Sequence, residues 1–177
     1  MLKIIFIDFF PDVFWLLRQL SIFNDFYLGA FACVELATHA ILGKQVALKI
    51  IARNEIRDPY VKQNFHREAS ILSRLNHPNI VKLVEIVCTE NIYCLVLEYL
   101  PHSNTFYEVL KNNGALSESL ACTFSKQLVS GLSYLHSKNI LHRDLKLDNI
   151  LVDKDRTRCL LIDFGLSNSW IPGQVII

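Results

Sequence analysis

The stretch that decides the fold lies near the end of the chain, where residues 142–149 read HRDLKLDN and residues 163–165 read DFG. The apolar run ILV directly follows the first motif, CLLI directly precedes the second, and mainly charged residues separate the two runs. Apolar runs around a charged turn are typical of a β-hairpin. The sequence therefore predicts a hairpin that presents Asn149 at one end and Asp163 at the other.

Together the two motifs resemble the catalytic loop and the metal-binding loop of a eukaryotic protein kinase. The alternative, an ordinary charged surface turn, does not account for the order of so many positions followed by DFG. The resemblance implies transfer of the γ-phosphoryl group of ATP to a protein hydroxyl. It also implies that Asp144 accepts the proton of that hydroxyl, that Lys146 lies beside the transferring phosphate, and that Asn149 and Asp163 hold Mg²⁺. A lysine two residues after Asp144 is typical of serine/threonine kinases.

Residues 46–49, VALK, resemble the kinase strand whose lysine holds the α- and β-phosphates. Alternation along a strand places Ala47 and Lys49 on one face of it and Val46 and Leu48 on the other. By the same resemblance, Ala47 packs against the adenine ring. A lone lysine in a strand is usually a solvated side chain, so the strand motif depends on further support.

That support comes from Glu68, which occupies a step of an apolar stripe with helical spacing, formed by Val61, Phe65, Leu72 and Leu75. A carboxylate in a buried stripe is costly unless a cation accompanies it. We expect Glu68 to pair with Lys49, as the equivalent residues do in an active kinase. The alternative is a glutamate at the rim of the stripe that reaches water.

The remaining elements follow the order of a two-lobed kinase. His77-Pro78 ends the helix that carries Glu68, and two strands are expected over 81–87 and 93–97. Ser117 can cap a further helix. We interpret the apolar face of that helix as core, and it consists of Leu120, Phe124, Leu128, Leu132 and Leu135. Residues 98–100 resemble the hinge that binds adenine. The nucleotide contacts that the resemblance implies are Gly29, Val34, Ala47, Lys49, Glu98, Leu100, Asn104 and Leu151.

These observations predict an α+β, two-lobed protein-kinase fold whose N-lobe is an antiparallel sheet with one helix and whose C-lobe is helical. We expect an atypical apolar segment over 1–21 and an incomplete kinase domain over 22–177. The domain divides into an N-lobe over 22–98, a hinge over 98–103 and a partial C-lobe over 104–177. Residues 166–168, LSN, resemble the AMP-activated-kinase-related branch of the calmodulin-dependent kinase group.

Two regions depart from the family. The phosphate-covering loop, YLGAFACV over 27–34, contains one glycine, Gly29, where the family has three, and we expect weaker ATP binding because side chains keep the backbone away from phosphate. The sequence stops at Ile177 before any Ala-Pro-Glu motif. We therefore expect a truncated form with uncovered apolar surface that a chaperone or regulatory partner keeps soluble.

Composition excludes several classes of function. A net charge of +1 argues against electrostatic binding of nucleic acid. Hydrophobic residues make up 51% of the chain and are concentrated in residues 1–23, but charged residues and a proline interrupt that segment, so no transmembrane span is expected. A signal peptide is the weaker alternative, because cleavage would remove the nucleotide loop. The five cysteines lack metal-site spacing, which favours reduced thiols in the cytosol or nucleus.

The function that the sequence predicts is ATP- and Mg²⁺-dependent phosphorylation of serine or threonine in a protein substrate. Two alternatives stay open. One is a catalytically impaired, kinase-like module that binds nucleotide or regulates a partner, and the other is an unstable truncated translation product.

Overall fold

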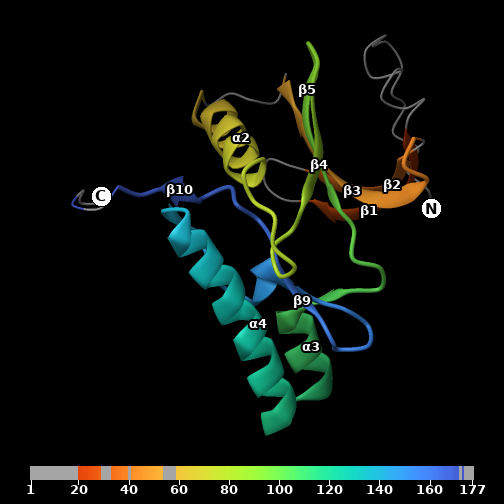
Figure 1. The fold of residues 1–177 in the computed structure, drawn as a ribbon. Helices are drawn as coiled ribbons and strands as arrows, with labels where there is room; N and C mark the ends of the chain where they lie inside the picture. Colours follow the sequence, from red (N-terminus) through yellow and green to blue (C-terminus); the bar gives the residue numbers. More distant parts are fainter. Residues whose placement is uncertain (1–19, 29–32, 40, 54–58, 172, 174–177) are drawn as a thin grey trace. The chain divides into compact units, whose positions relative to one another are not determined.

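The computed structural model describes residues 20–28, 33–39, 41–53, 59–171 and 173. Gly29 and the apolar N-terminal segment before residue 20 lie outside the described residues. Contacts divide the chain into two compact units (Figure 1). Unit 1 contains residues 1–61 and 84–99, and unit 2 contains residues 62–83 and 100–177. One boundary thus falls between Tyr99 and Leu100, within the stretch that resembles a hinge.

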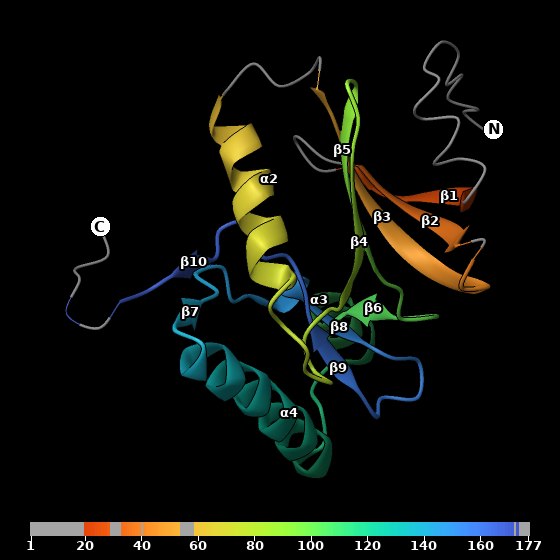
Figure 2. The same cartoon turned by 45° about the horizontal axis from the view of Figure 1, so that its top comes forward.

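Unit 1 is built on an antiparallel sheet with the strand order β1-β2-β3-β5-β4 (Figure 2). The strands are β1 (Leu20–Leu28), β2 (Cys33–His39), β3 (Lys44–Ala52), β4 (Leu83–Cys88) and β5 (Ile92–Glu98). The strand predicted around residues 46–49 and the strands predicted over 81–87 and 93–97 are confirmed, and the ends of the latter two move by one or two residues. Such shifts are expected, because strand ends depend on the neighbouring strand's register.

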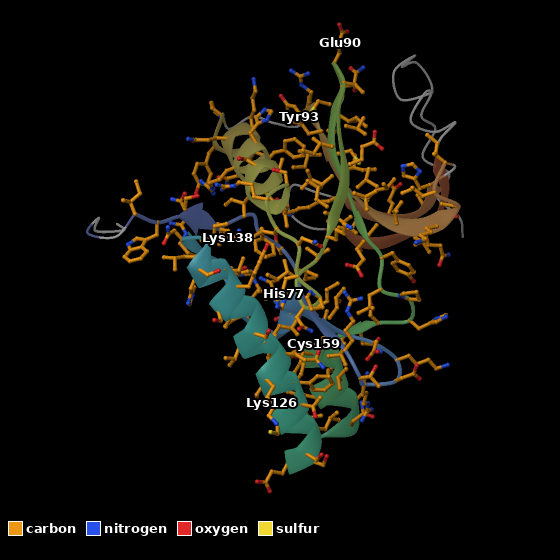
Figure 3. The ribbon with its side chains drawn as sticks, viewed as in Figure 1. His77, Glu90, Tyr93, Lys126, Lys138 and Cys159 are labelled. Atoms are coloured by element: carbon orange, nitrogen blue, oxygen red, sulfur yellow. The ribbon has the colours of Figure 1, made fainter. Side chains whose placement is uncertain are left out.

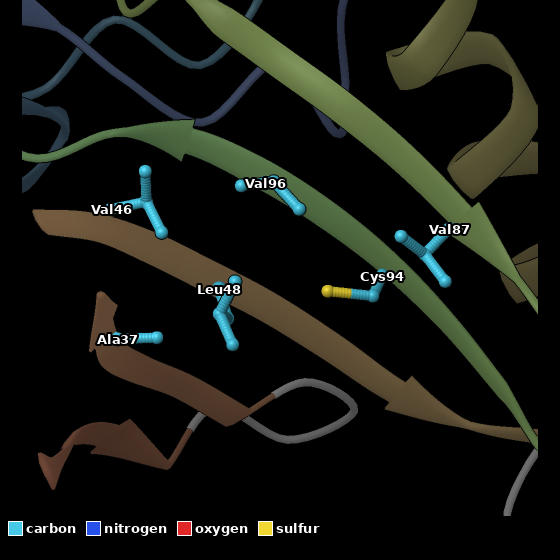
Figure 4. Close-up of a cluster of buried hydrophobic side chains, with 6 residues drawn as sticks. All are labelled: Ala37, Val46, Leu48, Val87, Cys94 and Val96. Atoms are coloured by element: carbon cyan, nitrogen blue, oxygen red, sulfur yellow. The ribbon is translucent and has the colours of Figure 1, made fainter. Parts of the chain in front are cut away.

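One face of this sheet carries the core of unit 1. Its buried cluster consists of Ala37, Val46, Leu48, Val87, Cys94 and Val96 (Figure 4). The alternation predicted for the strand with the VALK motif is confirmed, since Val46 and Leu48 join this cluster and Lys49 is only half-buried. Burial raises the pKa of the Cys94 thiol to about 12, so it remains protonated in the core.

Helix α2 (Pro59–Leu72) carries the predicted stripe. Phe65, Glu68 and Leu72 are buried, and Glu68 exposes only 4% of its surface. This burial contradicts the alternative of a glutamate at the rim that reaches water. The helix ends at Leu72, earlier than His77-Pro78, because residues 73–74 turn and take the chain away from the helix axis.

Unit 2 also contains α3 (Phe106–Asn113) and α4 (Glu118–Ser137). Thr105 and Glu108 form a capping box at the start of α3, and Gly114 follows its end with φ 74°. The predicted cap is confirmed, since the Ser117 side chain accepts a hydrogen bond from the Leu120 N–H. The Phe106 and Phe124 rings meet edge to face at 5.4 Å and join the two helices.

The predicted hairpin is confirmed as β8 (Ile150–Val152) and β9 (Cys159–Leu161), which pair antiparallel and form a small sheet with β6 (Asn104–Thr105). A 3₁₀ turn over Leu147–Asn149 precedes β8. Strands β7 (Ile140–Leu141) and β10 (Asn168–Ser169) pair beside the end of α4 (Figure 2).

The prediction that the whole apolar stripe of α4 is core is wrong in part. Phe124 and Leu135 are buried, whereas the leucines between and before them, Leu120, Leu128 and Leu132, are half-buried. The buried face is centred instead on Gly131, where an added Cβ would lie 3.6 Å from the Asn79 carbonyl oxygen. The helix therefore contacts residues 79–80 most closely at Gly131, a position that the spacing of the leucines does not predict.

Gln127 of α4 fastens this helix to the hairpin. Its Oε1 accepts hydrogen bonds from Asn79 Nδ2 at 2.9 Å and from the Cys159 N–H at 2.7 Å, and its Nε2 donates to the Thr157 carbonyl at 2.7 Å. Asn79 Nδ2 also donates to the Cys159 carbonyl. Figure 3 shows Cys159 beside α4. One side chain thus connects α4, the segment after α2, and β9.

We expect Gln127→Met to lower the free energy of unfolding by about 1 to 3 kcal/mol, because it removes the side-chain acceptor of the Cys159 N–H and one of the two acceptors of the Asn79 amide. Urea denaturation would measure the loss. The matched control is Lys126→Met on the exposed side of the same helix, which should change stability little (Figure 3). Equal stability of both variants would show that the network does not hold the hairpin.

Among the described residues, no helix combines the length and apolar character needed to cross a membrane.

Candidate active site

The two sequence motifs form two loops of unit 2 with unusual backbone conformations. Arg143 and Asp163 have φ values of 65° and 59°, in the left-handed region that side chains with a Cβ seldom adopt. The Arg143 Nε donates to the Leu166 carbonyl at 2.6 Å, and the Gly165 N–H donates to Asp163 Oδ1 at 3.3 Å. Such conformations persist where surrounding contacts hold them, as happens at functional sites.

The Asp144 carboxylate is the centre of the first loop. Its Oδ2 accepts hydrogen bonds from Lys146 Nζ and from Asn149 Nδ2, each at 2.8 Å. The hydrogen bond from Lys146 is the main reason that the pKa of Asp144 lies below its usual value, and Asn149 adds to the effect. Asp144 is therefore ionised at neutral pH, and its Oδ1 is left as the oxygen that can face a substrate hydroxyl.

Asn149 positions both loops. Only 6% of it is exposed, and its Nδ2 donates to the backbone carbonyl and to the side chain of Asp144. Its own backbone carbonyl accepts from the Ile162 N–H at 2.9 Å across the hairpin. Because the amide nitrogen makes both donor contacts, the Oδ1 of Asn149 is the atom that can bind a cation.

Asp163 follows Ile162 directly, so the hairpin brings its exposed carboxylate toward the first loop. Its charge opposes the lowering of the Asp144 pKa, and it contributes, after Asp144 itself, to raising the pKa of Lys146. Asp144, Lys146, Asn149 and Asp163 thus form one electrostatic cluster in unit 2.

His142 contacts the backbone on both sides of this cluster. It is buried, its Nδ1 accepts from the Asp144 N–H at 3.3 Å, and its Nε2 lies 3.1 Å from the Ile162 carbonyl. These partners place the proton on Nε2, and burial lowers the pKa of the ring, which favours the neutral form. The ring packs edge to face on the fully buried Phe164 at 4.8 Å.

The structural roles of His142 and of Ser167, whose Oγ donates to the His142 carbonyl, were not predicted from the sequence. The sequence signal for His142 was its place as the first residue of the first motif, and that for Ser167 was its place two residues after the second motif. Both contacts connect residues more than nineteen positions apart, which spacing along the chain does not reveal.

The oxygen atoms of Asn149 and Asp163 are suited to a hard divalent cation. In the part of the chain that the structure describes, no three His, Cys, Asp or Glu side chains gather closely enough to hold a metal ion. Mg²⁺ usually takes one or two protein oxygens and completes its octahedron with water and phosphate oxygens. The two side chains therefore fit a Mg²⁺ that arrives with a phosphate ligand.

The other residues expected to bind nucleotide lie in both units. In unit 1, Val34, Ala47 and Lys49 are on β2 and β3, and Glu98 ends β5. In unit 2, Leu100 is buried, Asn104 is exposed on β6, and Leu151 is half-buried on the adjacent β8. Glu68 lies on α2. The nucleotide contacts of these residues and of Gly29 stay predictions.

Comparison with known proteins agrees with this geometry. The family model described as the protein kinase domain matches residues 28–175. The chain belongs to this family. It is 41% identical over 141 residues to the human protein named hormonally up-regulated neu tumor-associated kinase, and 40% identical to the mouse protein of that name. A homolog A from Xenopus laevis is 39% identical. Each match covers 79% of this chain and 20% of the relative, so the chain spans about a fifth of the length of these relatives.

Family membership confirms the predicted α+β kinase fold, with its antiparallel sheet and helices. Members of this family in general use ATP and Mg²⁺, and they act on protein substrates. The catalytic and metal-binding roles of Asp144, Lys146, Asn149 and Asp163 stay predictions.

We expect Lys146→Met to raise the pKa of Asp144, because the variant removes the strongest hydrogen bond to the ionised carboxylate. A ¹³C NMR titration of the carboxyl group would measure the shift. The matched control is Lys154→Met in the exposed hairpin turn, which should leave the titration unchanged.

Since the folded-state pKa of Asp144 is lowered, stability from this carboxylate is present above its unfolded pKa of about 3.9 and is lost as pH falls through the folded pKa. An unchanged midpoint in Lys146→Met would contradict the assignment.

Proposed function

We propose that this protein is a serine/threonine kinase that transfers the γ-phosphoryl group of ATP to a hydroxyl of a protein substrate. The observation that carries the proposal is the Asp144 carboxylate, held ionised by Lys146 and Asn149 at the end of a hairpin that also positions Asp163. Lys146, two residues after Asp144, supports serine/threonine specificity. Residues 166–168, LSN, support the AMP-activated-kinase-related branch.

In this proposal Asp144 orients the attacking hydroxyl with its Oδ1, because Oδ2 is occupied by two donors. The hydroxyl oxygen bonds to the γ-phosphorus, the bond to the β,γ-bridging oxygen breaks, and the hydroxyl proton passes to Asp144. A carboxylate of low pKa is a weak base, so its main contribution is orientation, with proton acceptance late in the transfer. Lys146 places positive charge beside the transferring group.

Mg-ATP, when bound, supplies the phosphoryl group and part of the positive charge that stabilises the transition state. The residues that would hold the metal are Asn149, through Oδ1, and Asp163, through its carboxylate. His142 keeps the Asp144 backbone in place and stays neutral, so it does not compete for the cation.

A second candidate function is a kinase-like module that binds nucleotide or a partner without turnover. The observation that favours it is the loop over 27–34, which contains Gly29 as its one glycine. Loss of close backbone contact with phosphate would weaken ATP binding while the cluster around Asp144 stays intact.

We propose that the protein is located in the cytosol or nucleus. We further propose that its substrate is a protein with an accessible serine or threonine and that a chaperone or regulatory protein is its partner. The five cysteines support a reducing compartment, because all of them are free thiols in the structure. Fractionation of cells that produce the chain would test the location.

A phosphotransfer assay with a serine peptide and Mg-ATP separates the two functions. We expect Asp144→Asn to lower the transfer rate about 10² to 10⁴-fold, because it removes the proton acceptor but keeps the shape. The matched control is Asp148→Asn, an exposed carboxylate of the same loop, which should retain the rate. Mg-ATP binding without any transfer by the unsubstituted chain would favour the module, and neither binding nor transfer would contradict both functions.

The pairing of Lys49 with Glu68 stays a prediction, and a double-mutant cycle tests it. Loss of one member of a buried pair typically costs about 3 to 5 kcal/mol, and we expect less for a half-buried lysine. The double variant Lys49→Met, Glu68→Leu should be no less stable than either single variant. Lys44→Met, an exposed change on the same strand, serves as the control. Additive losses of unfolding free energy would show that the two residues are not coupled.

A further inference from the structure

Asn113 is the one asparagine of the sequence that a glycine follows, and the pair lies at the end of α3. The backbone nitrogen of the next residue can attack the side-chain amide of an asparagine at Cγ, because the product is a five-membered ring. Glycine hinders this attack least, since it has no Cβ and its backbone is freer than that of other residues. Residues 111–115 are exposed, so water reaches the pair. The sequence and the exposure together single out Asn113 for deamidation.

Two hydrogen bonds in the last turn of α3 oppose the attack. The Gly114 N–H donates to the Leu110 carbonyl at 2.8 Å, which holds the attacking nitrogen within the helix. The Asn113 Nδ2 donates to the Val109 carbonyl at 2.8 Å, which holds the amide against the preceding turn. A nitrogen whose hydrogen is bonded to a carbonyl loses its proton less readily and cannot turn toward Cγ. The reaction therefore requires both hydrogen bonds to open.

No side chain in the last turn of α3, a helix that the structure describes in full, is buried. The buried side chains of the helix are Phe106 and Val109 in its first half, whereas residues 111–113 are exposed. Local opening is cheapest where few apolar side chains are buried and the backbone hydrogen bonds face water. The turn that contains Asn113 therefore opens more easily than the first half of the helix.

We propose that Asn113 is a site of spontaneous deamidation and that the last turn of α3 controls its rate. When the turn opens, the Gly114 nitrogen loses its proton and bonds to Asn113 Cγ, the bond from Cγ to Nδ2 breaks, and ammonia leaves with the proton. Water then adds to one of the two carbonyl carbons of the ring. Opening of the ring leaves aspartate or isoaspartate at position 113, with a carboxylate in place of the amide.

Deamidation weakens the same turn that controls it. A carboxylate cannot donate to the Val109 carbonyl, and negative charge is unfavourable at the C-terminal end of a helix, where the helix dipole is negative. Lys111 in the same turn offsets part of this charge. Helix α3 packs against the 3₁₀ turn over Leu147–Asn149 and against β8, all within unit 2. Loosening of α3 therefore extends to the turn that carries Asn149. The inference does not depend on phosphotransfer by this chain.

The first test incubates the whole chain in warm, neutral buffer and follows the conversion of amide to acid at Asn113 by mass spectrometry of its peptides. We expect conversion to be about tenfold slower under native conditions than in concentrated urea, as for a turn that opens locally. Thr105→Ala removes the cap of α3 and should speed native conversion about threefold, because cap loss destabilises a helix. The matched control is Thr105→Ser, which keeps the capping oxygen and should leave the rate unchanged.

Equal rates in buffer and in urea would overturn the control by α3, and so would an unchanged native rate in Thr105→Ala. In urea Thr105→Ala and the unsubstituted chain should convert at the same rate, and a difference there would show a local sequence effect and overturn the control as well. Absence of conversion at Asn113 in both solvents would overturn the site.

The second test measures hydrogen exchange in Asn113→Asp, which carries the carboxylate of the product. We expect the protection of the Gly114 amide to fall about fivefold, because its turn has lost one hydrogen bond. The matched control is Asn112→Asp, which places the same charge on the exposed neighbour and should reduce this protection less. Equal losses in the two variants would overturn the role of the Asn113 amide. Unchanged protection of the Asn149 amide in Asn113→Asp would overturn the link to the 3₁₀ turn.

Discussion

The Asn149 side chain and backbone together hold the candidate active site. The amide donates twice to Asp144, and the backbone carbonyl accepts from Ile162 across the hairpin. Asn149 is buried, so these hydrogen bonds are needed to offset the cost of removing an amide from water. A residue that must satisfy all these partners at once allows little variation in the distance between the two loops. The position of Asp163 beside Asp144 is a consequence of this constraint.

The electrostatics of the site follow from where each charge is exposed. Asp144 is partly exposed and hydrogen-bonded to Lys146, so its ionised form is stabilised, whereas burial keeps His142 neutral behind it. Negative charge therefore faces outward, where a cation and a hydroxyl can approach, and the neutral His142 ring lies behind it. Asp163 adds a second carboxylate that raises the cost of ionisation and increases the attraction for a divalent cation. The same arrangement serves proton acceptance and metal binding.

The scaffold behind the site is assembled from segments distant in sequence. Gln127 connects α4 to β9 and to Asn79, and the close approach at Gly131 brings α4 against residues 79–80. Two arginines, one within α2 and one just after it, hold the segment that follows Asp163. Residues 62–83 therefore support both the hairpin and the segment after it within unit 2. Substitutions in residues 62–83 can therefore alter the position of the metal-binding loop even though no residue of the site itself is replaced.

The sequence by itself determined the elements with local signals. Apolar patterns predicted three of the five strands in the sheet of unit 1 and the hairpin, with Asn149 and Asp163 at its two ends, and Ser117 predicted the start of α4. Only the tertiary structure decided which side chains are buried and which atoms form hydrogen bonds. The tautomer of His142 depends on Ile162, the buried face of α4 follows Gly131 rather than its leucines, and the exposure of Ser169 contrasts with the burial of Ser167. These features escape sequence reasoning because burial and hydrogen-bond partners are set by elements that are remote along the chain, while periodicity reports only on one element at a time.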